Sequence, residues 1–233
     1  MAEHISSHFN QELENVRTEV MRMGGLVERQ LQSVLEALSG SDVSGLAAVI
    51  DGDGAINDLE IQIDDECQTI IARRQPAAGD LRFVLAVSRV IVDLERIGDE
   101  LKKIALTAHE LLSHNRTTTT ELYDTHRIAE MTMPMIRRSL DAFARLDDLA
   151  IVNLRESDRK LDTDYRNQTR LLVTRMMEDP HSIGVWLDVM MMNKAVERIG
   201  DHATNIAEHV VYLTRGIDVR HTPLDEIKQN LGE

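Results

Sequence analysis

Apolar residues recur along the chain at alternating spacings of three and four, which is the period of one face of an α-helix. In the first half this pattern covers residues 9–38, a segment that follows the break at 39–42, and residues 81–112. Asp42 and Asp80 stand where the second and third segments begin, so each is expected to be the N-cap of its helix. The first half therefore predicts three consecutive helices.

The second half repeats this plan. A helix is expected over residues 121–146, a second from Asp147 or Asp148 to Glu178, and a third after Ser182, its expected cap, to residue 214. Pro134 lies inside the first of these and lacks a backbone donor, so it should kink the helix unless the helix begins there. The segment from Gly216 onward is expected to add a helical turn or to fray.

The repeat is most evident in the string Glu-Arg-Ile-Gly-Asp, which occurs at residues 95–99 and, 102 residues later, at 197–201. We predict an all-α fold of two tandem three-helix bundles related by internal duplication. The first bundle is expected over residues 1–114, the second over 121–215, and a C-terminal tail over 216–233. The polar stretch 113–120, which contains four consecutive threonines, is the expected linker.

An unbroken apolar stripe along the third helix of each half is expected to form the packing seam of its bundle. In the first half its members are Phe83, Val87, Val90, Leu94, Ile97, Leu101, Ile104 and Ala108. Their equivalents in the second half are Val185, Val189, Met192, Val196, Ile199, Ala203, Ile206 and Val210.

Composition narrows the classes of function. The formal net charge is −14, which disfavours contact with a phosphate backbone, so we expect no nucleic-acid partner. Cys67 is the only cysteine, which excludes an intrachain disulfide and fits a reducing compartment. The N-terminus has no signal-peptide pattern, and no apolar run approaches the roughly 18 residues of a membrane span, so a cytoplasmic location is expected.

Acidic and amide side chains four residues apart occupy equivalent places in the two halves. Such pairs stack one turn apart on one helix face, and those of the third helices point away from the apolar seam. The residues are Glu95 with Asp99, Glu197 with Asp201, Asp53 with Asn57, and Asp158 with Asp162. Like charges at this spacing repel, and either a solvated surface, a neighbouring arginine or a bound cation must compensate. The recurrence in both halves favours metal binding.

Gly98 and Gly200 lie inside the two repeated motifs and indicate that something packs closely against each of them. Glycine inside a helix costs about 1 kcal/mol relative to alanine, so a repeated one indicates that another helix or a ligand comes near.

With these motifs identified, nearly the whole chain resembles the PhoU family of regulators of bacterial phosphate uptake. The resemblance lies in Gln75-Pro76 followed by 80–82, in the two segments 94–99 and 196–201, and in Met23-Gly24 followed by 26–28. It implies two three-helix bundles and multinuclear metal sites built from the repeated acidic pairs. Oxygen ligands alone admit Fe, Zn, Mn, Mg or Ca, so the sequence does not name the metal. Asn57 departs from the family pattern, so the second-half site is expected to bind metal more strongly.

The resemblance also implies a function. Members of the family are negative regulators of the phosphate regulon and modulators of phosphate uptake, and they act as metal-binding adaptors. The implied partners are a PhoR-type sensor histidine kinase, a PstB-type transporter ATPase and a second copy of the chain. Contact with the membrane is expected only through these partners.

Two alternatives remain open: a di-metal carboxylate enzyme and a metal-free helical scaffold. The enzyme is disfavoured because the single Glu-x-x-His spacing, Glu178 to His181, is interrupted by Pro180, and the usual catalytic motifs are absent from the sequence. We therefore expect that the chain is not an enzyme. His202 and His209 are expected to be solvated or interfacial, although His202 could lie in the outer shell of a metal.

Overall fold

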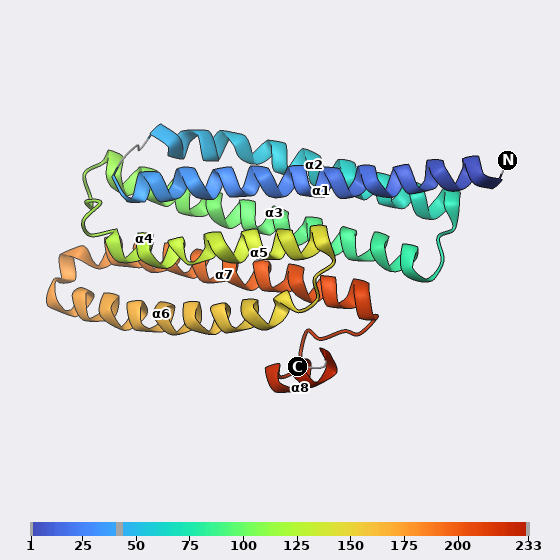
Figure 1. Cartoon of the computed structure of the whole chain (residues 1–233). Helices are drawn as coiled ribbons and strands as arrows, with labels where there is room; N and C mark the ends of the chain where they lie inside the picture. The colour runs from blue at the N-terminus through green and yellow to red at the C-terminus, as the bar shows by residue number, and fades with distance from the viewer. Residues whose placement is uncertain (1, 41–43, 232–233) are drawn as a thin grey trace.

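The computed structural model describes residues 2–40 and 44–231, and all regular secondary structure in these ranges is helical. Figure 1 shows the arrangement. In chain order the elements are α1 (Ala2–Leu38), α2 (Ser44–Arg74), α3 (Ala78–Ser113), α4 (Tyr123–Glu130), α5 (Thr132–Arg145), α6 (Ala150–Glu178), a short 3₁₀ helix (Pro180–Ser182), α7 (Ile183–Arg215) and α8 (Leu224–Leu231).

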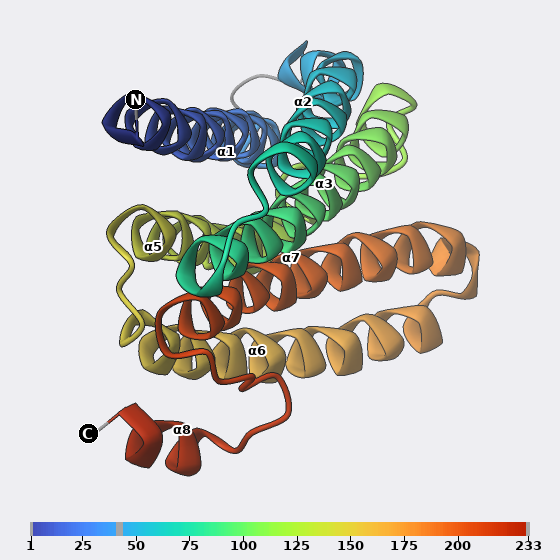
Figure 2. The same ribbon diagram turned by 90° about the vertical axis from the view of Figure 1, so that its right-hand side faces the viewer.

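The helices form two bundles that meet along α3 and α7. Helices α1, α2 and α3 pack together, as do α5, α6 and α7, and α3 adjoins α7 in both views (Figures 1 and 2). The two central helices run antiparallel, because Arg116 after the end of α3 meets Asp188 early in α7 at 3.5 Å, whereas Asp93 meets His209. The predicted all-α fold of two duplicated three-helix bundles is confirmed.

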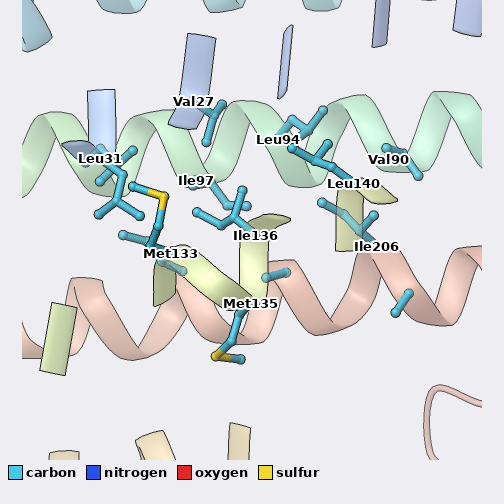
Figure 3. Packing of buried hydrophobic residues seen from close by; sticks show 14 of the residues in the cluster. Val27, Leu31, Val90, Leu94, Ile97, Met133, Met135, Ile136, Leu140 and Ile206 are labelled. Carbon is cyan, nitrogen blue, oxygen red and sulfur yellow. The ribbon is translucent and has the colours of Figure 1, made fainter. Parts of the chain in front are cut away.

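The core follows the two apolar stripes. All eight stripe residues of α3 are buried, and in α7 only Val185 is half-buried. Figure 3 shows Leu94 and Ile97 of α3 beside Val27 of α1, Ile136 and Leu140 of α5, and Ile206 of α7. The apolar core is therefore continuous from one bundle to the other, and no helix among the described residues is long and apolar enough to cross a membrane.

Two of the residues expected to cap helices, Asp80 and Ser182, do not do so in the structure. Helix α3 begins two residues before Asp80, after Ala77 in extended backbone, and Asp80 lies in its first turn rather than at the cap. An acidic residue is favourable at either place, because both are near the positive end of the helix dipole, so the sequence signal was ambiguous. Ser182 does precede α7, but its side chain donates to the Asp179 carbonyl and makes no cap bond. The expected cap Asp42 lies outside the described residues.

Pro134 lies near the start of a helix. The segment predicted as one helix over 121–146 is two, because the chain is interrupted at Met131 and α5 begins at Thr132. Pro134 therefore occupies the first turn of α5, where a missing backbone donor leaves no acceptor unsatisfied. The Thr132 hydroxyl donates to the Ala129 carbonyl at 2.7 Å and supports the junction.

The tail is ordered by contacts with the second bundle. Val219, Leu224 and Ile227 are buried, and Lys228 of α8 donates to Glu156 of α6 at 3.2 Å. Figure 2 shows α8 below α6. Of the two outcomes expected for the tail, an added helical segment or fraying, the structure shows the helical segment.

Helices α1 and α5 approach closely at Gly24. A Cβ added at Gly24 would lie 2.5 Å from Leu140 Cδ2 and 3.2 Å from Leu140 Cγ, and Leu140 is itself buried. At Gly54, in contrast, an added Cβ would meet no atom within 4 Å.

We expect Gly24→Ala to lower the free energy of unfolding by about 1–2 kcal/mol, because overpacking outweighs the gain of about 1 kcal/mol in helix propensity. The matched variant Gly54→Ala should be neutral or more stable by up to about 1 kcal/mol. Urea unfolding of the two variants checks this. Equal stability of the two variants would contradict the proposed close packing of the bundles.

Candidate functional site

The eight predicted metal ligands lie in two groups on equivalent helix pairs. The first group consists of Asp53, Asn57, Glu95 and Asp99 on α2 and α3, and the second of Asp158, Asp162, Glu197 and Asp201 on α6 and α7. The helical spacing that predicted these pairs is present in both places, and in both the carboxylates lie within electrostatic range of one another.

In the first group a lysine pairs with the buried carboxylate. Lys102 Nζ of α3 donates to Asp53 Oδ2 at 2.9 Å, and the Asn57 amide lies 3.4 Å from the same oxygen. The other oxygens, Asp53 Oδ1 and Asn57 Oδ1, are buried without a hydrogen-bond partner in the described part of the chain. Unpartnered buried oxygens are costly, and a cation or a water molecule is what usually satisfies them.

Glu60 belongs to the first group although the sequence reasoning missed it. The pKa of Glu95 is raised, first because the side chain is partly buried and then because Asp99, Glu60 and Asp53 lie near it. The pKa of Glu60 is itself raised by burial and by Asp64. Glu60 follows Asp53 by two helical turns, so the helical period could have found it.

The second group is more crowded with negative charge. Burial, followed by the charges of Asp201 and Asp162, raises the pKa of Asp158 to about 6. The pKa of Asp201 is also raised, by loss of hydration and then by Glu197, although part of this side chain is at the surface. These carboxylates repel one another, as the sequence predicted.

Side chains of the protein supply part of the compensation. Lys194 Nζ donates to Glu197 Oε2, and Arg166 donates to Asp162 Oδ2 at 3.2 Å. Arg198, which the sequence offered as compensation, instead pairs with Glu100 at 3.1 Å. Lys194 was missed because a lysine three residues from an acid on one helix is too common to signal a site.

The fit of a metal to these groups is partial. Carboxylate and amide oxygens have the right chemistry for a hard cation. Within residues 2–40 and 44–231, however, no three His, Cys, Asp or Glu side chains come together closely enough to hold a metal ion. In this conformation lysines take up oxygens that a metal would need.

The repeated glycines are explained by helix packing. A Cβ at Gly98 of α3 would lie 3.0 Å from Ile56 of α2, and one at Gly200 of α7 would lie 2.4 Å from Leu161 of α6. The close approach expected at both positions is that of the neighbouring helix. It also brings Asp53 and Asp158 near the glycine-bearing turns of α3 and α7.

A third polar cluster lies between the two bundles, and the sequence reasoning found only its histidines. Asp93 Oδ1 of α3 accepts from His202 Nδ1 at 2.8 Å and from Asn205 Nδ2 at 3.1 Å, while Oδ2 accepts from His209 Nε2 at 3.0 Å. Burial alone would raise the pKa of Asp93, but these hydrogen bonds outweigh it and lower the pKa. Of the two roles expected for the histidines, the interfacial one is confirmed.

A buried carboxylate adjoins this cluster. Glu208 of α7 is 4% exposed and pairs with Arg155 of α6. Loss of hydration raises the pKa of Glu208 to about 7, although Arg155 opposes the shift.

The duplicated architecture and paired acidic motifs can be compared with known proteins. The sequence model of the PhoU domain matches residues 20–108 and again 125–210, which together make up most of the chain. The chain belongs to the PhoU family. The two matched segments correspond to the two bundles, so the chain carries two PhoU domains in tandem.

Relatives match over almost their full length. The chain is 44% identical to the "Phosphate-specific transport system accessory protein PhoU homolog" of Pseudomonas aeruginosa, over 100% of the chain and 98% of that protein. It is 42% identical to the PhoU accessory protein of Escherichia coli, over 98% of the chain and 94% of the relative.

Solved structures of the PhoU family share the fold. The crystal structure of PhoU from Pseudomonas aeruginosa superposes with a TM-score of 0.83 at 43% identity, covering 90% of this chain and 100% of that one. The phosphate transport system regulatory protein PhoU from Streptococcus pneumoniae gives a TM-score of 0.81 at 26% identity, covering 91% and 99%.

We predict that Glu208 makes stability depend on pH. Because the folded-state pKa of about 7 lies above the ordinary value of 4.5, the folded protein retains this proton to higher pH than the unfolded chain does. The contribution to stability is therefore complete at low pH and is lost as pH rises from about 5 to about 8, with a slope of at most about 1.4 kcal/mol per pH unit.

The variant Glu208→Gln cannot titrate at this position. Relative to the parent chain, its free energy of unfolding should rise by about 2 kcal/mol between pH 5 and pH 8, measured by urea unfolding. Glu178→Gln, at an exposed carboxylate, is the matched control and should show no such trend. Parallel profiles for the parent chain and Glu208→Gln would show that the prediction is wrong.

Proposed function

We propose that this chain is a negative regulator of the phosphate regulon and a modulator of phosphate uptake. The observation that carries the proposal is its match, over nearly the whole length of both chains, to relatives named as accessory proteins of the phosphate-specific transport system. The PhoU family consists of accessory and regulatory proteins, and the chain is not an enzyme. It is an accessory protein of phosphate-specific transport.

The proposed mode of action is that of an adaptor in the cytoplasm between a PhoR-type sensor histidine kinase and a PstB-type transporter ATPase. Support comes from the surface: Ile183, Leu187 and Met191 of α7 follow one another at helical spacing, and each is at least 40% exposed. Such a strip is typical of a surface that docks a partner. The same proposal includes assembly of the chain into a homodimer. It also divides the chain into a first bundle over residues 1–114, a second over 121–215 and a tail over 216–233.

We further propose that the two acidic groups bind Fe, Zn, Mn or Mg. The second group is favoured, because its crowded carboxylates gain most when a cation replaces the repulsion that raises the pKa of Asp158. The unpartnered oxygens of Asp53 and Asn57 would serve in the first group. A bound metal would act there by neutralising charge and fixing α2 against α3, or α6 against α7.

A metal-free scaffold is the second candidate. The observation that favours it is that Lys102, Lys194 and Arg166 already pair with Asp53, Glu197 and Asp162. Metal binding at either group must displace these cations from their carboxylates.

Deletion of the gene tests the regulatory proposal. We expect a phosphate-starvation reporter to be derepressed in phosphate-rich medium and repressed again when the intact gene is restored. Complementation with Glu197→Ala/Asp201→Ala shows whether the second acidic group is needed. Unchanged reporter expression after deletion would overturn the proposal.

Elemental analysis of the chain purified without an affinity tag tests metal binding. We expect bound transition metal or magnesium in the parent chain and a loss of metal in Glu197→Ala/Asp201→Ala, because two oxygen donors of the second group are gone. The control Asp141→Ala/Glu178→Ala removes two exposed carboxylates outside both groups and should keep the metal. Metal at background level in every sample would favour the metal-free scaffold.

A further inference from the structure

A hollow that contains several arginines lies between the two bundles, and one of its residues, Arg96, adjoins Glu95 of the first acidic group. Its volume is about 360 Å³, and its walls come from α3, α7 and the segment that leads to α8. Its arginines are Arg89, Arg96 and Arg220, and its carboxylates are Asp93 and Glu208.

Two of the arginines retain donors that no carboxylate occupies. Arg96 is exposed and makes no hydrogen bond or ion pair in the described part of the chain, although Glu60 and Glu95 lie within electrostatic range. The Arg89 guanidinium lies 5.0 Å from the centroid of the Tyr212 ring, a contact that uses its face and leaves its N–H edge available.

The internal duplication explains why Arg96 lacks a partner. Its equivalent in the second half, Arg198, pairs with Glu100 across the boundary between the bundles. The equivalent of Glu100, 102 residues later, is His202, which carries no carboxylate and is hydrogen-bonded to Asp93. The departure from symmetry at residue 202 therefore leaves Arg96 without this ion pair and facing the hollow.

The carboxylates of the hollow are already engaged. Both oxygens of Asp93 accept hydrogen bonds from His202, Asn205 and His209, and Glu208 pairs with Arg155. Burial favours the neutral form of Glu208, since it raises the pKa of that side chain to about 7. These contacts offset part of the negative charge that Asp93 and Glu208 present to an incoming anion.

The tail completes the wall. Arg220 is held by two hydrogen bonds from its Nε to the Asp218 carboxylate at 2.9 and 3.0 Å, and its carbonyl lies 3.4 Å from Arg155 Nη2. Burial of Val219 next to it fixes this segment against the second bundle. The hollow thus joins three parts of the chain: the first bundle, the second bundle and the tail.

We propose that this hollow binds a phosphate-class oxyanion, either inorganic phosphate or a phosphate monoester, with Arg89 and Arg96 as its principal donors. Guanidinium groups match the tetrahedral oxyanion with parallel, charge-assisted hydrogen bonds. The site differs from the acidic groups in place and in the charge of its ligand. It also does not depend on the regulatory role proposed above, because binding is measured on the purified chain.

Isothermal titration of the purified full chain with inorganic phosphate, and separately with phenyl phosphate, tests the proposal. Ionic strength is held constant with sodium chloride, and a chelator is present so that metal on the acidic groups cannot supply the binding. We expect saturable binding of at least one ligand. Tighter binding of inorganic phosphate identifies the free ion as the ligand, and tighter binding of phenyl phosphate identifies a monoester.

Variants locate the binding. Arg96→Gln and Arg89→Gln should each weaken it roughly tenfold, as expected for the loss of one charge-assisted contact. Arg96→Gln breaks no hydrogen bond of the described structure, so loss of folding does not confuse the result. Arg138→Gln, at an exposed arginine of α5 outside the hollow, should leave affinity unchanged. The proposal is overturned if neither ligand binds saturably, or if both hollow variants bind as tightly as the parent chain.

Discussion

The packing of α3 against α7 is the constraint on which the rest of the structure depends. Each helix carries an apolar stripe that is buried in its own bundle, and the two helices also bury each other, so one continuous core serves both halves. Once these faces are fixed, the helical period decides where every polar side chain of α3 and α7 lies. Glu95 and Asp99 are turned toward α2, Glu197 and Asp201 toward α6, and Asp93 toward the other bundle.

The carboxylates of the two acidic groups can be neutralised either by lysines of the chain itself or by a cation from solution. Burial and mutual repulsion raise the pKa of Asp158 and of Glu95, which means that both groups have a net deficit of positive charge. Lys102 and Lys194 reduce that deficit without removing it. A flexible lysine is also a replaceable partner, because it can move into solvent at little cost when a stronger cation arrives.

The sequence was sufficient for the helices and the duplication because both rest on local periodicity. The break at Met131 was foreseen only as one of two possibilities, since Pro134 is compatible with a kink and with a helix start. The partners of the acidic residues could not be predicted. The helical period places Glu60 on the same face of α2 as Asp53, but whether Lys102 bonds Asp53 depends on how α2 packs on α3. Asp93 was missed because its partners are on α7, and no local pattern encodes the register between two helices more than 100 residues apart.

Duplication followed by divergence gives the two halves different chemistry on a common plan. Pairing of Arg198 with Glu100 is a contact that a symmetric molecule would make twice. With His202 in place of the second glutamate, the contact is made once, Asp93 has His202 as a partner, and Arg96 is left toward the hollow. The same fold can then present oxygen ligands on the outer sides of its central helices and guanidinium donors between its bundles, because the apolar seam holds these surfaces apart.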